Sequence, residues 1–510
     1  MAEVRLAELV AALSLGVDLG FGQPMEHVLR ESMIALRLAD RIGLEDAERS
    51  TVYYTGLLVG VGCHADAHEQ AKWFGDDIAL KSTKYDHDFR SVRAAAAMMS
   101  LVGSGNPPLH RFRVGLEFAI SGRHDLDGMV ARHAAVASAL AERLGLPAAV
   151  QEAVGASYEQ WDGKGWPVGL AGDRIPVAAR LVQFAEFIEV AHRLGGNDEA
   201  LALAEKRSGL QFDPALSAAL RADPDGILGE LDSAHTWSAV IDAEPALRVT
   251  LRGDSFDRAL RAVADFVDLK SPYTLGHARA VAELAAATAD QLGVSDDEAR
   301  ELRQAALVHD LGRLGVSNAI WDKPGPLGAG EWERVRLHPY LTERILQQSS
   351  ALAPLAAIAV QHRERLDGSG YPKGLSGGAI TRPARILGAV DAYRSMRELR
   401  PYRPPLRAEQ AAAELQADVR AGKLDAQAVA AVLAAAGHPV GRRREWPAGL
   451  TTREVDVLRL VARGLSSKQI ATQLVITPKT ARNHIEHIYT KIDASSRVSA
   501  SLFATEHGLL

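Results

Sequence analysis

The sequence holds a single cysteine, Cys63, among its 510 residues. A lone thiol excludes a disulfide within the chain and fits a reducing cytoplasm. Long apolar runs are also missing, because no stretch reaches the roughly 18 residues that a membrane-spanning helix needs. The N-terminus carries Glu3, Arg5 and Glu8 ahead of a short apolar patch and lacks the layout of a signal peptide. We therefore expect a cytoplasmic protein with no membrane partner.

Alternating runs typical of β-strands are scarce as well. Alanine-rich segments with apolar residues three and four positions apart dominate instead, as in residues 277–292 and 408–434, and this spacing predicts amphipathic helices. We expect an all-α fold. Hydrophobic residues make up 47% of the chain and charged residues 24%, as in ordinary globular proteins, and the length predicts two to four domains.

Charge is distributed unevenly along the chain. Residues 441–510 hold 11 Lys and Arg against 6 Asp and Glu, a net charge of +5, whereas the whole chain has a formal net charge of -6. The remaining residues therefore carry -11, the difference between these two values. A basic tail on an acidic body indicates that the tail alone has a nucleic-acid partner.

The first half of the chain is an altered copy of the second. Residues 26–62 align without a gap with residues 276–312 at an offset of 250, and residues 162–182 align with residues 367–387 at an offset of 205. Because the offset falls by 45, the first copy contains an insertion of 45 residues after Cys63. Two blocks that share order as well as content favour duplication over chance similarity.

A histidine followed directly by an aspartate, His309-Asp310, stands at the centre of the second copy, and His338, His362 and Asp391 follow it. Imidazole nitrogen and carboxylate oxygen suit one or two ions of Mn, Fe or Zn. Neighbouring side chains on a helix point about 100° apart, so this pair can share an ion only at the helix flank. There Asp310 would bridge two ions, which favours phosphodiester cleavage. Arginines near these residues are candidates for contacting phosphates, namely Arg313, Arg363 and Arg365.

The first copy lacks the central part of this ligand set. Four ligands of the second copy are replaced in the first copy: His309 by Val59, Asp310 by Gly60, His362 by Ser157 and Asp391 by Glu186. Two histidines persist, His27 and His133. We therefore expect the first copy to bind no catalytic metal and to be retained for packing, dimerisation or sensing. A short cluster near Cys63 is interpreted as a polar loop rather than a metal site, namely His64, Asp66 and His68.

The second copy resembles the HD-GYP family of helical metal-dependent phosphohydrolases, which cleave cyclic di-GMP. The resemblance covers about Asp254 to Leu406 and rests on the ordered motifs LVHDLGRLGV, LHPYLTERIL, AVQHRERLDGSGYPKGL and RILGAVDAYRSM. It implies metal ligands at His277, His309, Asp310, His338, His362 and Asp391. Catalytic roles are expected for Asp310 and Arg313. Substrate contacts are expected at Arg363, Arg365, Asp367 and the namesake loop of Gly370, Tyr371 and Pro372.

Three positions depart from the family pattern. The family's second histidine after His362 is Arg363 here, so a ligand of the second metal is missing, and a guanidinium repels a nearby ion. The family's lysine after the histidine–aspartate pair is Arg313, which keeps the charge but changes the shape of the donor. Tyr273 replaces a glutamate of some members, which argues against a third metal. We expect a site for one metal or a weakened site for two. Slow hydrolysis and binding without hydrolysis both stay open.

A connector that contains proline and arginine, residues 437–449, precedes the C-terminal residues 450–510. Three helix starts are expected in this tail, with capping pairs Thr451 and Glu454, Ser466 and Gln469, and Thr477 ahead of Pro478. The helix after Pro478 has an apolar face, expected to pack on the earlier helices, and a basic face that also carries an amide. A recognition helix in the major groove of DNA requires this division.

The tail resembles the LuxR-type helix-turn-helix over nearly its whole length, through LTTREVDVLRLVARGLSSKQIATQL and TPKTARNHIEHIYTK. The resemblance implies double-stranded DNA as the partner, with contacts at Lys479, Thr480, Asn483, His484, His487 and Lys491. We expect the lysines to contact phosphates and Asn483 to contact a base edge. The last helix, about Ser495 to His507, carries the dimer contact in this family. We expect a homodimer, because one such domain buries too little surface for tight specific binding.

These features predict four segments: a degenerate HD-GYP-like copy at 1–248, an HD-GYP-like copy with metal ligands at 249–436, a linker at 437–449 and a LuxR-type domain at 450–510. The leading hypothesis is a transcription regulator whose tandem body senses a cyclic dinucleotide or another phosphate ligand. The alternative is an active cyclic di-GMP phosphodiesterase with an accessory DNA-binding domain. Metal analysis with a turnover assay discriminates between them.

Overall fold

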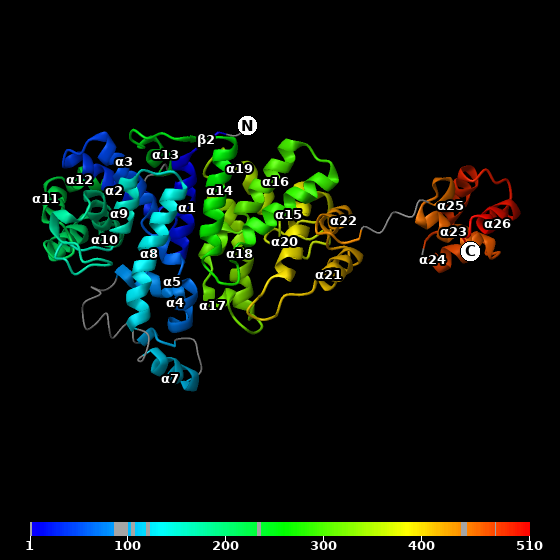
Figure 1. The fold of residues 1–510 in the computed structure, drawn as a ribbon, viewed down its shortest axis with the longest axis horizontal. Helices are drawn as coiled ribbons and strands as arrows, with labels where there is room; N and C mark the ends of the chain where they lie inside the picture. Colours follow the sequence, from blue (N-terminus) through cyan, green and yellow to red (C-terminus); the bar gives the residue numbers. More distant parts are fainter. Residues whose placement is uncertain are drawn as a thin grey trace. The chain divides into compact units, whose positions relative to one another are not determined.

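The computed structural model describes residues 3–85, 100–103, 108–118, 123–231, 236–439, 446–474 and 476–509. These residues form helices joined by short connections, together with a pair of two-residue strands, so the expected all-α fold is confirmed. The chain divides into two compact units, Met1–His438 and Pro439–Leu510 (Figure 1). Within the described ranges, no helix combines the length and the apolar character that crossing a membrane demands.

The larger unit contains both copies of the repeat. The first copy contains α1 (Leu6–Gly20), α2 (His27–Arg41), α3 (Asp46–Leu58), η1 (Val61–His64), α4 (Ala67–Phe74), α5 (Asp77–Ser82), η2 (Thr83–Tyr85), α7 (Pro108–Glu117), α8 (Arg123–Arg143), α9 (Ala148–Gly155), η4 (Gly172–Arg174), α10 (Val177–Arg207), α11 (Pro214–Ala222), α12 (Pro224–Leu228) and α13 (Thr236–Asp242). The second copy contains α14 (Gly253–Asp268), α15 (His277–Leu292), α16 (Asp296–Val308), η5 (Leu311–Gly315), α17 (Asn318–Trp321), α18 (Ala329–Leu346), α19 (Ala353–Ala359), η6 (Gly377–Ala379), α20 (Arg382–Arg397), α21 (Ala408–Arg420) and α22 (Ala426–Ala435).

The two copies repeat individual contacts as well as the order of their helices. The buried carboxylate of Asp18 accepts a hydrogen bond from the Val28 amide at 3.1 Å, and that of Asp268 accepts one from the Ala278 amide at 2.9 Å. Burial raises the pKa of both carboxyl groups to about 7. Matched contacts at equivalent positions show that the duplication read from the sequence is present in the fold.

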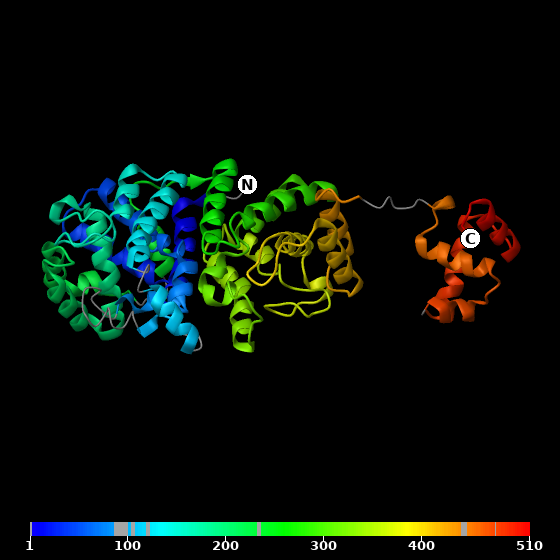
Figure 2. The same cartoon turned by 60° about the horizontal axis from the view of Figure 1, so that its bottom comes forward.

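The copies pack directly on each other. Helix α1 contacts η5 and α18 of the second copy, and α8 contacts α14; Figures 1 and 2 show the dark-blue α1 facing the green helices of the second copy. Strand β1 (Val4–Arg5) pairs antiparallel with β2 (Thr250–Leu251). Gly16 permits the close approach of α1, because a Cβ there would lie 2.9 Å from Cδ1 of Leu314. The copies therefore form one packed body.

A buried carboxylate of the first copy is bonded to the second copy. Asp77, the first residue of α5, accepts hydrogen bonds from the Ser317 hydroxyl and the Asn318 amide, both at 2.8 Å. Lys81 and Lys270 donate to its other oxygen at 3.1 and 3.2 Å. Burial alone would raise the pKa of Asp77, but the two ammonium groups hold it below its ordinary value. Because Ser317 and Asn318 begin α17, the first copy fixes the start of that helix.

Replacing Asp77 with asparagine is expected to lower the free energy of unfolding by roughly 2 kcal/mol at neutral pH, because two buried lysines lose their counter-charge. The folded pKa of Asp77 is depressed, so its stabilising effect is complete above the unfolded pKa of about 4 and is lost as the pH falls towards the folded value. Urea unfolding of both proteins at neutral and at acidic pH measures this difference. A gap of equal size at both pH values would contradict the charge assignment.

The smaller unit contains, in its described residues, the 3-10 turn η7 (Pro447–Gly449) and four α-helices: α23 (Thr452–Ala462), α24 (Ser467–Leu474), α25 (Pro478–Lys491) and α26 (Arg497–Glu506). The expected caps are confirmed, because Thr451 and Glu454 form a capping box and the Thr477 hydroxyl accepts a hydrogen bond from the Thr480 amide at 3.1 Å. The apolar face of α25 packs as expected into a core whose members include Val455, Leu458, Ile470, Ala481 and Ile488.

Candidate functional site

The six expected metal ligands lie together inside the second copy, and all six are buried. They come from five places in the fold, because α15 begins at His277, α16 ends just before His309 and Asp310, α18 carries His338, the turn after α19 carries His362, and α20 carries Asp391. A close backbone approach brings the histidine–aspartate pair against α18. A Cβ at Gly312 would lie 2.1 Å from the His338 carbonyl oxygen, so only glycine permits this contact.

The ligand atoms form two groups that Asp310 joins. In one group, Oδ1 of Asp391 lies 3.3 Å from Nε2 of His277 and 3.9 Å from Nε2 of His309. In the other, Oδ1 of Asp310 lies 3.5 Å from Nε2 of His338 and 3.8 Å from Nε2 of His362. The second oxygen of Asp310, Oδ2, lies 3.7 Å from Nε2 of His309. The two carboxylate oxygens of Asp310 therefore face different groups, as a bridging ligand requires.

Each histidine is held through its other ring nitrogen. The Nδ1 atoms lie 2.6 to 2.7 Å from backbone carbonyl oxygens, in the pairs His309 with Ala306, His338 with Val335, and His362 with Ala359. A proton on Nδ1 that is donated to a carbonyl leaves Nε2 as the free donor atom, which is the arrangement found around protein-bound metals. These contacts orient the three rings towards the centre.

Glu398 holds the fourth ring and was not singled out in the sequence. Its Oε2 lies 2.8 Å from Nδ1 of His277. Burial lowers the pKa of His277, but the nearby carboxylates of Asp391 and Glu398 outweigh it and raise this pKa to about 9. A metal at this position must therefore displace a proton from the ring. An acidic residue seven positions after a ligand, just past the end of α20, is a weak sequence signal, because the chain holds 64 Asp and Glu.

The remaining ligands have the protonation states that a metal needs. Burial lowers the pKa of His338 to about 3 and holds that of His362 well below its ordinary value, so both rings are neutral. Burial opposes ionisation of Asp310, but its neighbours, the His309 ring first and the Arg313 guanidinium second, hold its pKa well below the ordinary range. Metals bind neutral imidazole and ionised carboxylate. The donor set therefore matches a divalent cation in charge as well as in geometry.

Buried polar atoms without a hydrogen-bond partner support the same fit. Nε2 of His277, Nε2 of His309 and Oδ1 of Asp310 are such atoms, and all three face the centre of the cluster. A buried polar atom left unpaired is costly, so its presence in a well-packed interior indicates a missing partner. Mn, Fe or Zn would satisfy all three through one or two ions.

Two of the departures from the family pattern lie against the metal ligands. The guanidinium of Arg363 lies 3.2 Å from Oδ2 of Asp391, and that of Arg313 lies 3.3 Å from Oδ2 of Asp310. Arg313 also stacks on the ring of Trp321, with 3.8 Å between the guanidinium carbon and the ring centroid. Each guanidinium therefore shares a carboxylate with the candidate metal site, which weakens the hold on a second ion.

The GYP loop lies beside the histidines. The ring of Tyr371 meets the edge of His338 at 6.1 Å between centroids. Buried Glu364 holds the loop, because its carboxylate accepts hydrogen bonds from the amides of Lys373 and Leu375 at 2.8 and 2.9 Å. A Cβ at Gly370 would lie 2.4 Å from the Glu364 Cα, so this position accepts only glycine. Glu364 was missed in the sequence, although Glu159 of the first copy holds the matching loop.

The other expected substrate contacts have partners of their own. The guanidinium of Arg365 donates to the carbonyl oxygens of His362 and Glu364 at 3.3 and 2.8 Å. The exposed carboxylate of Asp367 accepts hydrogen bonds from the amide and hydroxyl of Ser369 at 3.0 and 2.7 Å. Both residues thus shape the loop, and their contact with a substrate stays a prediction, as does that of Pro372.

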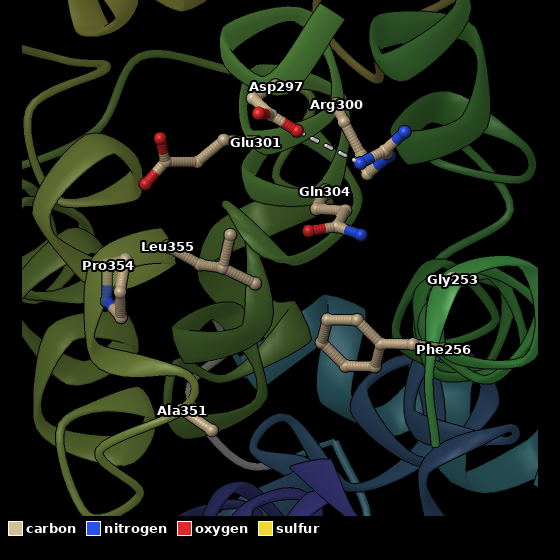
Figure 3. A pocket seen from close by; sticks show the side chains of 9 residues that line it. All are labelled: Gly253, Phe256, Asp297, Arg300, Glu301, Gln304, Ala351, Pro354 and Leu355. Atoms are coloured by element: carbon tan, nitrogen blue, oxygen red, sulfur yellow. Dashed lines mark hydrogen bonds and ion pairs between the residues drawn. The ribbon is translucent and has the colours of Figure 1, made fainter. Parts of the chain in front are cut away.

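A separate open pocket of about 260 Å³ lies between α14, α16 and α19 (Figure 3). Its polar rim comes from α16, where Asp297 and Arg300 form an ion pair at 3.2 Å, and Phe256 and Leu355 line its apolar part. None of the six metal ligands lines this pocket. It is therefore distinct from the metal centre.

Helix α25 presents most of the expected DNA contacts to solvent. The side chains of Lys479, Thr480, Asn483 and His487 are exposed, and that of His484 is half-buried. Lys491 differs, because its ammonium donates to Glu454 at 2.8 Å and to the Gly449 carbonyl oxygen at 3.1 Å. A phosphate contact from Lys491 would have to compete with these bonds. All six DNA contacts stay predictions.

Comparisons with known proteins identify two kinds of domain in the chain. The pattern of the HD domain matches residues 124–216 and 261–428, and that of bacterial regulatory proteins of the luxR family matches residues 448–504. The 3'3'-cGAMP-specific phosphodiesterase 3 of Vibrio cholerae is 31% identical over 81% of this chain and 90% of its own length. A cyclic di-GMP phosphodiesterase of Pseudomonas aeruginosa is 32% identical over 51% of this chain and 62% of its own.

A solved structure extends the comparison to the fold. The crystal structure of a cyclic GMP-AMP specific phosphodiesterase of V. cholerae superposes with a TM-score of 0.59 and 28% identity, over 85% of this chain and 98% of that chain. The second HD match contains all six expected metal ligands, and the luxR match contains α25. The chain therefore belongs to the HD domain family, with an HD-GYP-type second copy, a degenerate first copy and a LuxR-type helix-turn-helix domain.

Proposed function

We propose that the chain is a cytoplasmic DNA-binding transcription regulator whose second copy binds a divalent metal and a cyclic dinucleotide. The convergence of six buried ligands, with unpaired Nε2 and carboxylate atoms facing one another, carries the proposal. The relatives named above act on 3'3'-cGAMP or cyclic di-GMP, so these two molecules are the first ligands to test. The exposed side chains of Val498 and Leu502 on α26 support a homodimer.

The residues around the metal ligands have separate tasks in holding a phosphate ligand. A metal ion supplies a Lewis acid for a phosphate oxygen and lowers the pKa of bound water. Arg313 and Arg363 place two guanidinium groups beside the ligand carboxylates, where they can donate to phosphate oxygens. Trp321 holds the guanidinium of Arg313 over its ring, and Tyr371 offers an aromatic ring for stacking on a nucleobase.

Hydrolysis of the same ligand is a second candidate function. Asp310 faces both ligand groups with different oxygens, as a bridging carboxylate does in two-metal phosphodiesterases. The pairing of Arg363 with Asp391 opposes it, because a fixed positive charge lies 3.2 Å from the second oxygen of a carboxylate whose first oxygen faces His277 and His309. We therefore place ligand-controlled DNA binding first and turnover second.

One set of measurements on the full chain separates the two functions. Calorimetry of the Mn²⁺-loaded protein with 3'3'-cGAMP and with cyclic di-GMP measures binding, and chromatography of the same samples detects the linear product. DNA shifts with and without the ligand then measure coupling. The regulator predicts ligand-dependent DNA affinity with little product, and the phosphodiesterase predicts many turnovers. Absence of metal and ligand binding would contradict both.

Two substitutions on α25 are expected to affect DNA binding in different ways. Asn483→Ala should cost roughly 1–3 kcal/mol at one base position and relax sequence choice there, because a base-edge contact is lost. Lys479→Ala should weaken binding to all sequences alike and reduce the salt slope by about 1, because a phosphate contact is lost. Fluorescence anisotropy with selected and mismatched DNA at several salt concentrations measures both, with the exposed Thr490→Ala as control. Unchanged affinity and preference in Asn483→Ala would refute the groove assignment.

A further inference from the structure

The first copy retains part of a metal site and has gained a carboxylate. His27 and Glu186 align with His277 and Asp391 of the second copy, and both are buried. Glu31 is also buried, and neither of its carboxylate oxygens has a hydrogen-bond partner. One of these oxygens lies 4.0 Å from Nε2 of His27, the ring nitrogen that corresponds to a metal-facing atom in the second copy. Two acidic side chains and an imidazole of the first copy are therefore buried at the positions that correspond to one end of the second copy's ligand set.

Two residues of the insertion in the first copy contact these buried side chains. Its 3-10 turn η2 carries Lys84, whose ammonium donates to Oε1 of Glu186, and Tyr85, whose hydroxyl donates to the same oxygen at 3.0 Å. The hydroxyl of Tyr85 also lies 3.4 Å from Nε2 of His27. Two neighbouring residues of the insertion thus contact both retained ligands, at the atoms that face the metal centre in the second copy.

Aromatic rings and acidic side chains surround the ammonium group of Lys84 and favour its charged form. Its Nζ lies 5.6 to 5.8 Å from the centroids of four aromatic rings, namely Phe21, Tyr85, Tyr158 and Phe187, and such faces attract an ammonium. Burial lowers the pKa of Lys84, but Glu186, Cys63 and Glu31 outweigh it and raise this pKa above its ordinary value. A neutral amine would leave the buried carboxylate of Glu186 without a counter-charge.

We propose that Lys84 is the resident cation of the first copy and takes the place that a metal ion would have in a complete HD site. The insertion then explains why the first copy keeps His27, and a carboxylate at Glu186, after losing its histidine–aspartate pair. The ammonium neutralises the retained ligands without a metal. The metal content of the chain is consequently set by the second copy alone, and the fold of the first copy does not depend on metal.

The test removes the ammonium and asks whether a metal replaces it. All variants carry Asp310→Asn in the full chain, which disables the second site. Lys84→Met keeps the length of the side chain without its charge, and Lys72→Met, at an exposed lysine of the same insertion, is the matched control. Metal content is measured after dialysis against Mn²⁺, and melting temperature is measured with EDTA and with Mn²⁺.

We expect the Lys84→Met variant to melt roughly 5 °C lower in EDTA, because buried carboxylates lose their partner. Mn²⁺ should restore the melting temperature, and about one ion per chain should remain bound, since His27, Glu31 and Glu186 offer one nitrogen and carboxylate oxygens. The parent and Lys72→Met should bind none. Metal content and melting temperature equal to those of the parent would overturn the proposal. If Lys84→Met is insoluble, recovery in cells grown with added Mn²⁺ supports it, and equal loss with and without Mn²⁺ overturns it.

Discussion

Asp310→Asn is expected to remove the metal from the second copy and to lower any phosphodiester turnover at least roughly 1000-fold. The two oxygens of Asp310 face different ligand groups, with His309 at 3.7 Å from one and His338 at 3.5 Å from the other. An amide carries no charge and offers a single oxygen, so it cannot serve both groups. The same substitution should abolish the metal-dependent part of cyclic dinucleotide binding.

Metal analysis of the purified full chain checks this expectation, together with calorimetry of 3'3'-cGAMP binding. Asp297→Asn makes the same chemical change at an exposed carboxylate of α16 and should leave the metal content unchanged. Circular dichroism confirms that both variants keep their helices. Metal content equal to wild type in Asp310→Asn would show that the six residues are not the ligand set.

The six expected ligands, which the structure brings together, could be picked out from the sequence because histidines in a fixed order stand out. Histidine is uncommon, with 17 in the chain, so the histidine–aspartate pair and the histidines after it stand out. The same holds for α25, where Thr477 ahead of Pro478 marks the start and apolar spacing marks the buried face. Local signals of this kind survive folding because capping and helix periodicity depend on neighbours in sequence.

Contacts between residues far apart in the chain could not be predicted from the sequence. The cluster near Cys63 was interpreted as a polar loop, and this was wrong. His64 is buried in η1, Asp66 binds Arg132 at 3.0 Å, and His68 binds Asp322 of the second copy at 2.8 Å. These partners lie up to 254 positions away, so no local pattern identifies them. The contact of Lys84 with Glu186 could not be predicted for the same reason, because the two residues lie 102 positions apart.

Arg363→His is the substitution expected to produce the largest gain of function. Arg363 forms an ion pair with Oδ2 of Asp391 at 3.2 Å, and it occupies the position where the family has a second histidine. Replacement removes a guanidinium from a ligand carboxylate and adds an imidazole next to His362. We expect metal to bind roughly 10-fold to 100-fold more tightly at the weakened position, with turnover rising in step.

The same change should weaken the hold on the cyclic dinucleotide, because a guanidinium that can donate to a phosphate is lost. Mn²⁺ titration and product analysis measure the gain, and calorimetry measures the loss. Arg363→Gln separates the causes, since it removes the charge without adding a ligand. Tighter metal binding in Arg363→His alone indicates coordination by the new imidazole. Tighter metal binding in both variants indicates relief of repulsion. Neither variant gaining metal or turnover would show that Arg363 does not limit the site. A rise in turnover together with weaker binding of the cyclic dinucleotide would show that this single residue decides between ligand binding and hydrolysis.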